Sequence, residues 1–157
     1  MPVPFQMIAL PFEDFDALFS LNDEALQALG AKRMVADKKP GYPCRVSLID
    51  AEPGETVLLL PFPYHDVASS YRASGPIFVR ANAQTAKPAV NEVPEMLRTR
   101  LLSIRAYDEK AMMVGADVGN GSELEEHIIR FFNDPNVKYL HLHNARPGCF
   151  NCRVVRA

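Results

Sequence analysis

Residues 101–132 read LLSIRAYDEKAMMVGADVGNGSELEEHIIRFF, and this stretch decides the fold class. Two runs of strand-forming residues, Leu101 to Tyr107 and Ala111 to Val118, flank the turn sequence Asp108-Glu109-Lys110. Runs that are separated by so short a turn pair as an antiparallel hairpin. The first part of the stretch therefore predicts antiparallel strands.

The second part of the stretch predicts a helix. Ser122-Glu123-Leu124-Glu125 has the form of a capping box, in which the serine side chain accepts a backbone hydrogen bond. Apolar residues then recur at helical spacing, at Leu124, Ile128, Phe131 and Phe132. Asn133-Asp134-Pro135 ends the helix. We expect a helix over 122–133 that packs on one face of the sheet.

Short elements continue on both sides of this unit. We expect strands at Cys44–Ile49, Thr56–Leu60, Pro76–Arg80, Val137–His143 and Phe150–Val155. Two short helices are expected near the N-terminus, one from the spacing of Phe12, Phe15 and Phe19 and one that Asn22 or Ser20 caps and Gly30 ends. The fold class is therefore α+β: a mostly antiparallel sheet with a C-terminal helix packed on one face and short N-terminal helices.

Composition excludes several classes of protein. The 157 residues suit one domain over 1–157, and a net charge of −2 argues against a nucleic-acid surface. No apolar run approaches the roughly 18 residues that span a membrane, and the N-terminus lacks the pattern of a secretory signal. Three unevenly spaced cysteines are typical of a reducing compartment, so we expect a cytoplasmic protein. A homo-oligomer is left open.

A histidine pair is the first candidate for chemistry. In Tyr139-Leu140-His141-Leu142-His143, the two leucines alternate with the two histidines. If the leucines pack on the core, both imidazoles project side by side from the other face. Such a pair offers a general acid and a general base, so His141 and His143 are candidate catalytic residues. The alternative is two histidines on a half-exposed sheet face.

The same histidines suggest metal ligands only weakly. With Cys149-Phe150-Asn151-Cys152 they would supply four zinc ligands, but an extended chain sends the two cysteines to opposite faces. A cupin-like metal site, which also uses an H-x-H pair, lacks the glutamate expected shortly after it. We therefore expect no metal and no cofactor.

Arginines form the second candidate group. Arg45 and Arg105 lie within expected strands, and Arg72 precedes the turn Ser74-Gly75-Pro76. Arginine is costly to bury, so a sheet face that holds several arginines pairs them with carboxylates or offers them to an anion. Both interpretations remain open, and the candidate carboxylate partners are Asp50, Asp108 and Asp117.

Several blocks of the sequence resemble one known family. They are GYPCRVSL at 41–48, AEPGE at 51–55, YRASGPIF at 71–78, EVPEMLR at 92–98, RAYD at 105–108 and HNAR at 143–146. Together they resemble a family of small bacterial proteins catalogued as domain of unknown function 1203. The resemblance spans nearly the whole chain and implies a bacterial, free-standing, single-domain protein. It implies no activity.

These observations lead to two hypotheses about function. The leading one is a site on the polar sheet face that binds a small anionic metabolite, with residues Arg45, Arg72, Arg105, His141, His143 and Asn144. In it the arginines and Asn144 hold the ligand, and the histidines supply acid–base chemistry if the protein is an enzyme. The alternative is a non-catalytic protein-interaction module, in which the same face docks a partner.

Overall fold

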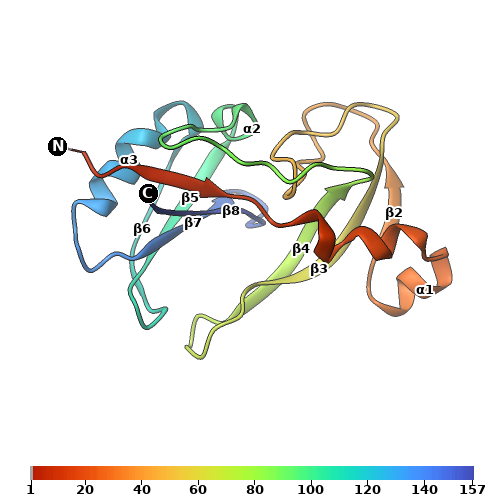
Figure 1. The fold of residues 1–157 in the computed structure, drawn as a ribbon, viewed down its shortest axis with the longest axis horizontal. Helices are drawn as coiled ribbons and strands as arrows, with labels where there is room; N and C mark the ends of the chain where they lie inside the picture. Colours follow the sequence, from red (N-terminus) through yellow and green to blue (C-terminus); the bar gives the residue numbers. More distant parts are fainter. Residues whose placement is uncertain (1) are drawn as a thin grey trace.

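A computed structural model describes residues 2–157 as two antiparallel sheets that lie side by side (Figure 1). The five-stranded sheet has the order β1 (Phe5–Ile8), β8 (Phe150–Arg156), β7 (Tyr139–Asn144), β5 (Leu101–Tyr107) and β6 (Met113–Asn120). The three-stranded sheet has the order β2 (Lys32–Val35), β3 (Thr56–His65) and β4 (Ala73–Arg80).

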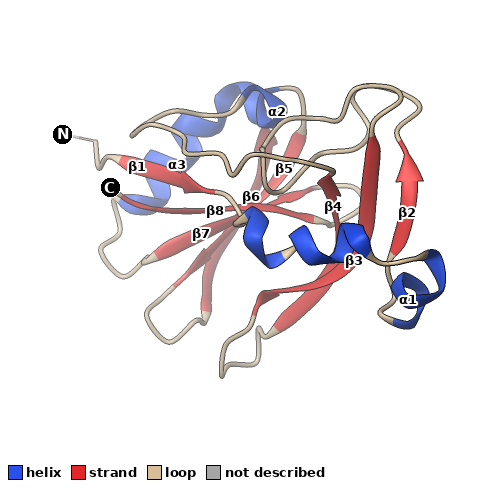
Figure 2. Cartoon of the chain, turned by 45° about the vertical axis from the view of Figure 1, so that its right-hand side comes forward, coloured by secondary structure: helices blue, strands red, loops and turns tan. Residues whose placement is uncertain are grey.

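The helices are short and lie around the sheets (Figure 2). They are α1 (Asp23–Ala28), α2 (Glu95–Arg98) and α3 (Leu124–Phe132), together with 3-10 turns at Phe12–Asp14, Asp16–Ser20 and Gly121–Glu123. This arrangement confirms the predicted α+β class, with mostly antiparallel strands and a C-terminal helix. Within residues 2–157, no helix is long and apolar enough to cross a membrane.

Helix α3 covers one face of the five-stranded sheet. Its apolar side chains Leu124, Ile128 and Phe132 are buried, as their spacing predicts. They share a core with Leu102 and Ile104 of β5 and with Leu140 and Leu142 of β7. Because side chains alternate along a strand, the residues that alternate with these four in β5 and β7 point to the other face of the sheet.

The predicted capping box is wrong. Helix α3 begins at Leu124, and no side-chain cap hydrogen bond is formed at its N-terminus. Gly121 donates its N–H to the carbonyl of Arg100 (2.8 Å), and a Cβ at Gly121 would lie 1.7 Å from the carbonyl oxygen of Leu97. This close backbone approach turns residues 121–123 into a 3-10 turn, so Ser122 lies inside the turn rather than at a cap.

The predicted strand Cys44–Ile49 is also wrong. Only isolated bridges form there, and the N–H of Leu48 donates to the carbonyl of Cys44 (3.0 Å), which closes a turn. Leu48 has a φ of 53°, in the left-handed region that interrupts extended chain. Arg45 therefore extends from a turn and not from a strand.

Strand β3 is longer than the predicted Thr56–Leu60 and reaches His65. Its pairing with β2 ends at Leu59, so the later part of β3 has a neighbour only on the β4 side. Pro61 and Pro63 are tolerated there because proline has no N–H, and no hydrogen bond is lost where that side of the strand has no neighbour. A bulge between Phe62 and His65 then breaks the regular pairing, and bulges redirect side chains.

Candidate functional site

The two candidate histidines lie on the face of β7 opposite α3. Their exposed fractions are 2% for His141 and 0% for His143, so the imidazoles are covered rather than half exposed. Leu140 and Leu142, which alternate with them, lie in the core with α3. The structure therefore has two buried imidazoles side by side on the second face of the sheet.

An arginine lies on each side of His141. The sheet register places Arg105 of β5 and Arg153 of β8 directly opposite His141, on its two neighbouring strands. Among residues 2–157 neither of these arginines forms a salt bridge. Arg105 donates from Nε to the hydroxyl of Ser103 (3.3 Å), and the Arg153 guanidinium lies 4.4 Å from the centre of the Tyr139 ring. Two cations without carboxylate partners thus flank one buried imidazole.

The end of β3 covers these imidazoles. The Tyr64 ring stacks on Phe150 with a centroid distance of 5.2 Å, and its edge meets His143 at 5.0 Å. His65 is 98% buried, with its ring 4.8 Å from that of His141. The two sheets therefore meet through a cluster of aromatic and imidazole rings.

Hydrogen bonds fix the orientation of His65. Its Nδ1 lies 2.8 Å from the carbonyl oxygen of Tyr71, and its Nε2 lies 2.6 Å from the hydroxyl of Tyr139. A carbonyl can only accept, so Nδ1 carries a proton, and in the neutral form of the imidazole the Tyr139 hydroxyl donates to Nε2. His65 and Tyr139 form a hydrogen-bonded pair of acid–base groups.

Burial keeps the two β7 histidines neutral. It lowers the pKa of His141 to about 2, and the nearby His65 adds to this effect. Burial also lowers the pKa of His143 to about 4, although the hydrogen bond from its Nδ1–H to the Gly148 carbonyl (2.9 Å) opposes the shift. Nδ1 of His141 and Nε2 of His143 are buried and have no hydrogen-bond partner among the described residues.

A cleft of about 520 Å³ opens over this cluster. It runs between the two sheets, and its lining includes Tyr64, His65, Tyr139, His141, Phe150 and Arg153. A volume in this range is typical of sites for small molecules. The lining combines aromatic rings, an acid–base pair and one cation without a carboxylate partner. It also includes two carboxylates, Glu109 and Asp66, of which Asp66 is paired with Arg72.

Arg45 lies behind this cluster, with an exposed fraction of 1%. Its Nε donates to the Phe150 carbonyl (2.7 Å) and its Nη1 donates to the Pro43 carbonyl. Burial lowers its pKa to about 10. The candidate carboxylate Asp50 instead binds Arg100 through both oxygens (2.9 and 2.6 Å). Arg45 is therefore held by backbone carbonyls.

The other candidate carboxylates also have different partners. Asp117 binds Arg130, and Asp108 accepts backbone N–H bonds from Lys110 and Met112. Among the described residues, none of the three forms a salt bridge with Arg45 or Arg105.

Two candidate ligand-binding residues, Arg72 and Asn144, are paired with other side chains and do not line the cleft over His141. Arg72 follows β3 on an exposed loop and pairs with Asp66 at 3.0 Å. Asn144 pairs in register with the core residue Leu102, and its Oδ1 accepts from Asn151 (2.8 Å). It lines a separate hollow of about 570 Å³ together with Arg98, Arg100 and Arg146. The structure thus brings together Arg45, Arg105, His141 and His143, but not Arg72 or Asn144.

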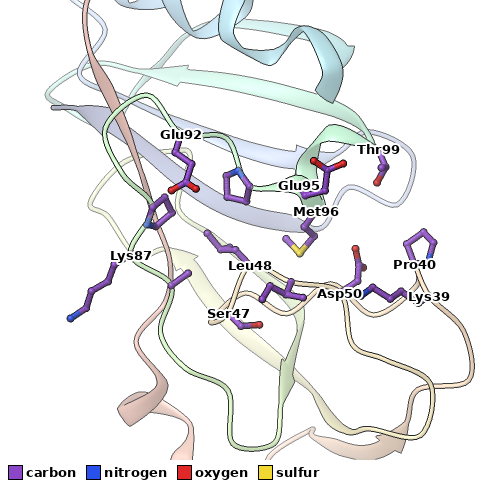
Figure 3. Close-up of a pocket in the computed structure, with 14 residues that line it drawn as sticks. Lys39, Pro40, Ser47, Leu48, Asp50, Lys87, Glu92, Glu95, Met96 and Thr99 are labelled. Atoms are coloured by element: carbon purple, nitrogen blue, oxygen red, sulfur yellow. The ribbon is translucent and has the colours of Figure 1, made fainter.

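A further pocket of about 440 Å³ lies between the turn around Leu48 and helix α2 (Figure 3). Leu48 and Met96 contribute apolar surface to it. Part of its charged lining is already paired, because Asp50 binds Arg100 and Lys39 binds Glu52. The cleft over His141 offers more chemistry, since two of the three buried side-chain polar atoms without partners among the described residues, Nδ1 of His141 and Nε2 of His143, lie beside it.

The cysteines show no pairing. Cys149 and Cys152 are both free, and Cys152 is buried beside Met7, where burial raises its pKa to about 12. In the part of the chain from residue 2 onward, no three His, Cys, Asp or Glu side chains are placed to hold a metal ion.

Sequence reasoning missed Tyr64, His65 and Arg153 as site residues. The sequence pattern could have pointed to Arg153, because this residue lies in the predicted strand Phe150–Val155, which follows the histidine strand in the sequence. Tyr64 and His65 lie beyond the predicted strand Thr56–Leu60, and no local pattern distinguishes them as site residues.

Comparison with known proteins defines the family but no activity. No curated protein and no solved structure gave a significant match. The family model described as protein of unknown function DUF1203 matches residues 41–156, so the chain belongs to the DUF1203 family.

Proposed function

We propose that the cleft over His141 binds a small molecule that carries a carboxylate or phosphate group. The observation that carries the proposal is the row Arg105, His141 and Arg153, in which two arginines without carboxylate partners flank a buried imidazole. A guanidinium binds carboxylate and phosphate oxygens through paired hydrogen bonds. Arg153 lines the cleft and would hold the anion, while Arg105 adds positive potential from the next strand.

The burial of the imidazoles supports a small ligand rather than a docked protein. A macromolecular partner would meet Tyr64, whose ring stacks on the buried Phe150, before it reached the histidines, whose exposed fractions are at most 2%. The aromatic lining also supports a ligand with an apolar or planar part.

The acid–base groups support a role in proton transfer once a ligand is bound. An anion beside His141 raises the pKa of the imidazole, because a negative charge favours the protonated form. The Tyr139 hydroxyl accepts a proton from a bound ligand as its own proton passes to Nε2 of His65, which is the direction that their hydrogen bond allows.

Thermal unfolding with two probes tests the binding proposal. We expect inorganic phosphate and benzoate, compared with chloride at equal ionic strength, to raise the melting temperature of the protein. Arg153→Met should abolish this increase. Arg146→Met is the matched control, because Arg146 is also exposed but lines a different hollow, and it should respond as the wild type does.

Two results would overturn the proposal. One is a wild-type protein that neither probe stabilises. The other is an Arg153→Met variant that remains folded and responds to the probes as the wild type does.

A further inference from the structure

The sheets end in four edge strands, which differ in their protection. The edges are β1 and β6 in the five-stranded sheet and β2 and β4 in the three-stranded sheet. A bare edge pairs readily with another chain, and proteins prevent this with covering segments, charged residues, proline or short strands.

The edge of β1 is covered by residues 88–91. The N–H of Asn91 donates to the Phe5 carbonyl (2.8 Å), and the N–H of Phe5 donates to the side-chain oxygen of Asn91 (3.0 Å). The side chain of Gln6 also donates to the Pro88 carbonyl (2.9 Å). The outer backbone groups of Phe5, at the start of β1, are therefore already paired.

The two edges of the three-stranded sheet are protected in other ways. Strand β2 has four residues and begins with Lys32 and Arg33, whose charges disfavour pairing. Strand β4 contains Pro76. On the outer side of β4, the N–H of Arg45 donates a hydrogen bond to the carbonyl of Phe78 (3.1 Å).

Among the described residues, strand β6 has none of these protections; its one irregularity is a bulge at Val114, near its start. It has eight residues, MVGADVGN, without lysine, arginine or proline. Its single charged residue, Asp117, binds Arg130 of helix α3. Val114, Ala116 and Val118 are exposed along one side, with exposed fractions of 44% for Val114 and 55% for Val118.

The backbone of β6 presents its outer groups at two of these residues. The N–H of Val118 donates to Oδ1 of the adjacent Asp117 (2.8 Å), so it does not pair with β5. Because backbone groups alternate between the two sides of a regular strand, those of Ala116 also point outward. The pairing with β5 shifts by one residue at Val114, since Ala106 pairs with Gly115 and Tyr107 with Met113, so the regular alternation covers residues 115–120. Asp117 binds Arg130 through its other oxygen, Oδ2. The N–H of Val118 can therefore leave Oδ1 and pair with another strand while the ion pair between Asp117 and Arg130 stays intact.

The apolar row is symmetric about Ala116, since Val114 and Val118 lie two residues on either side of it. We propose that two copies of this chain pair antiparallel through β6, with Ala116 opposite the partner's Ala116. Val114 then meets the partner's Val118, and the two five-stranded sheets become one continuous sheet. The contact is the same on both copies, as a two-fold dimer requires.

Neighbouring exposed residues extend this surface. Met112 precedes β6, and Leu101 of β5 pairs in register with Asn120 at the other end of β6; their exposed fractions are 39% and 40%. In the proposed pairing Met112 lies opposite the partner's Asn120, beside the partner's Leu101. One contact therefore covers the exposed apolar side chains of Val114 and Val118 along the edge, and Met112 and Leu101 extend the apolar surface at its two ends.

Sedimentation equilibrium and light scattering of the purified protein test this dimer. We expect the wild-type chain to have twice its monomer mass and Val118→Lys to have the monomer mass, because a lysine on the edge disfavours pairing. Val35→Lys is the matched control, since Val35 is 61% exposed on the protected edge strand β2. It should remain a dimer.

A second variant tests the register. In a chain with both Val114→Glu and Val118→Lys, each new carboxylate meets the partner's new ammonium group only if pairing is centred on Ala116. This double variant should regain the dimer mass in low salt and lose it in high salt, because salt screens exposed ion pairs. The proposal is overturned if the wild type is a monomer at every concentration, if Val118→Lys remains a dimer, or if the double variant remains a monomer.

Discussion

The two faces of the five-stranded sheet use the same strands but are built differently. On the α3 face, Leu140 and Leu142 join a continuous apolar core. On the other face, His141 and His143 lie among aromatic rings, and each has a buried nitrogen atom without a partner among residues 2–157. An apolar core gains stability from burial, whereas an imidazole without hydrogen-bond partners costs stability when it is buried. The first face holds the fold together, and the second has the properties of a site.

The largest effect is expected on the α3 face. Phe132 is fully buried beneath the helix, so Phe132→Ala should lower the free energy of unfolding by about 3–5 kcal/mol through lost contacts and a cavity. Urea denaturation monitored by circular dichroism measures this change. A loss below about 1 kcal/mol would contradict the view that this face supplies most of the stability.

The second prediction concerns acid sensitivity on the histidine face. His141 has a pKa of about 2 in the folded protein, against about 6.5 in an unfolded chain. Above pH 6.5 both states are neutral at this residue, and it makes no pH-dependent contribution. As the pH falls below 6.5, only the unfolded chain takes up the proton, so the free energy of unfolding falls by about 1.4 kcal/mol per pH unit.

His141→Phe removes this contribution and keeps a ring among the aromatic neighbours. Urea denaturation at pH 7.5 and pH 5.5 should show a smaller loss of stability on acidification in the variant than in the wild type. His143, whose pKa is about 4, should supply the remaining loss over this range. An equal loss in both proteins would mean that His141 is accessible to protons in the folded state.

The smallest effect is expected at Ser122. Its side chain makes no cap hydrogen bond to α3, so Ser122→Ala should change the free energy of unfolding by no more than about 0.5 kcal/mol. A loss near 1 kcal/mol, which is typical of a removed cap, would show that the serine caps the helix in solution. The same urea experiment distinguishes the two outcomes.

Much of the histidine face could be predicted from local patterns. The alternation in Tyr139–Asn144 separates the leucines from the histidines, and it needs only the two-residue period of a strand. The hairpin of β5 and β6 likewise follows from a short turn between two strand-like runs. Arg45 shows the limit of such patterns. Its stretch alternates like a strand, yet a left-handed residue at Leu48 closes a turn instead.

The amino-acid sequence by itself determined the α+β class, the buried stripe of α3 and the two-sided character of β7, because these depend on periodicities of a few residues. Only the tertiary structure decided that the end of β3 covers the histidines. The hydrogen bond between His65 and Tyr139 joins residues 74 positions apart, and no local pattern encodes such a contact. Burial by these distant residues lowers the pKa values of His141 and His143, so the chemistry of the site arises from packing between the two sheets.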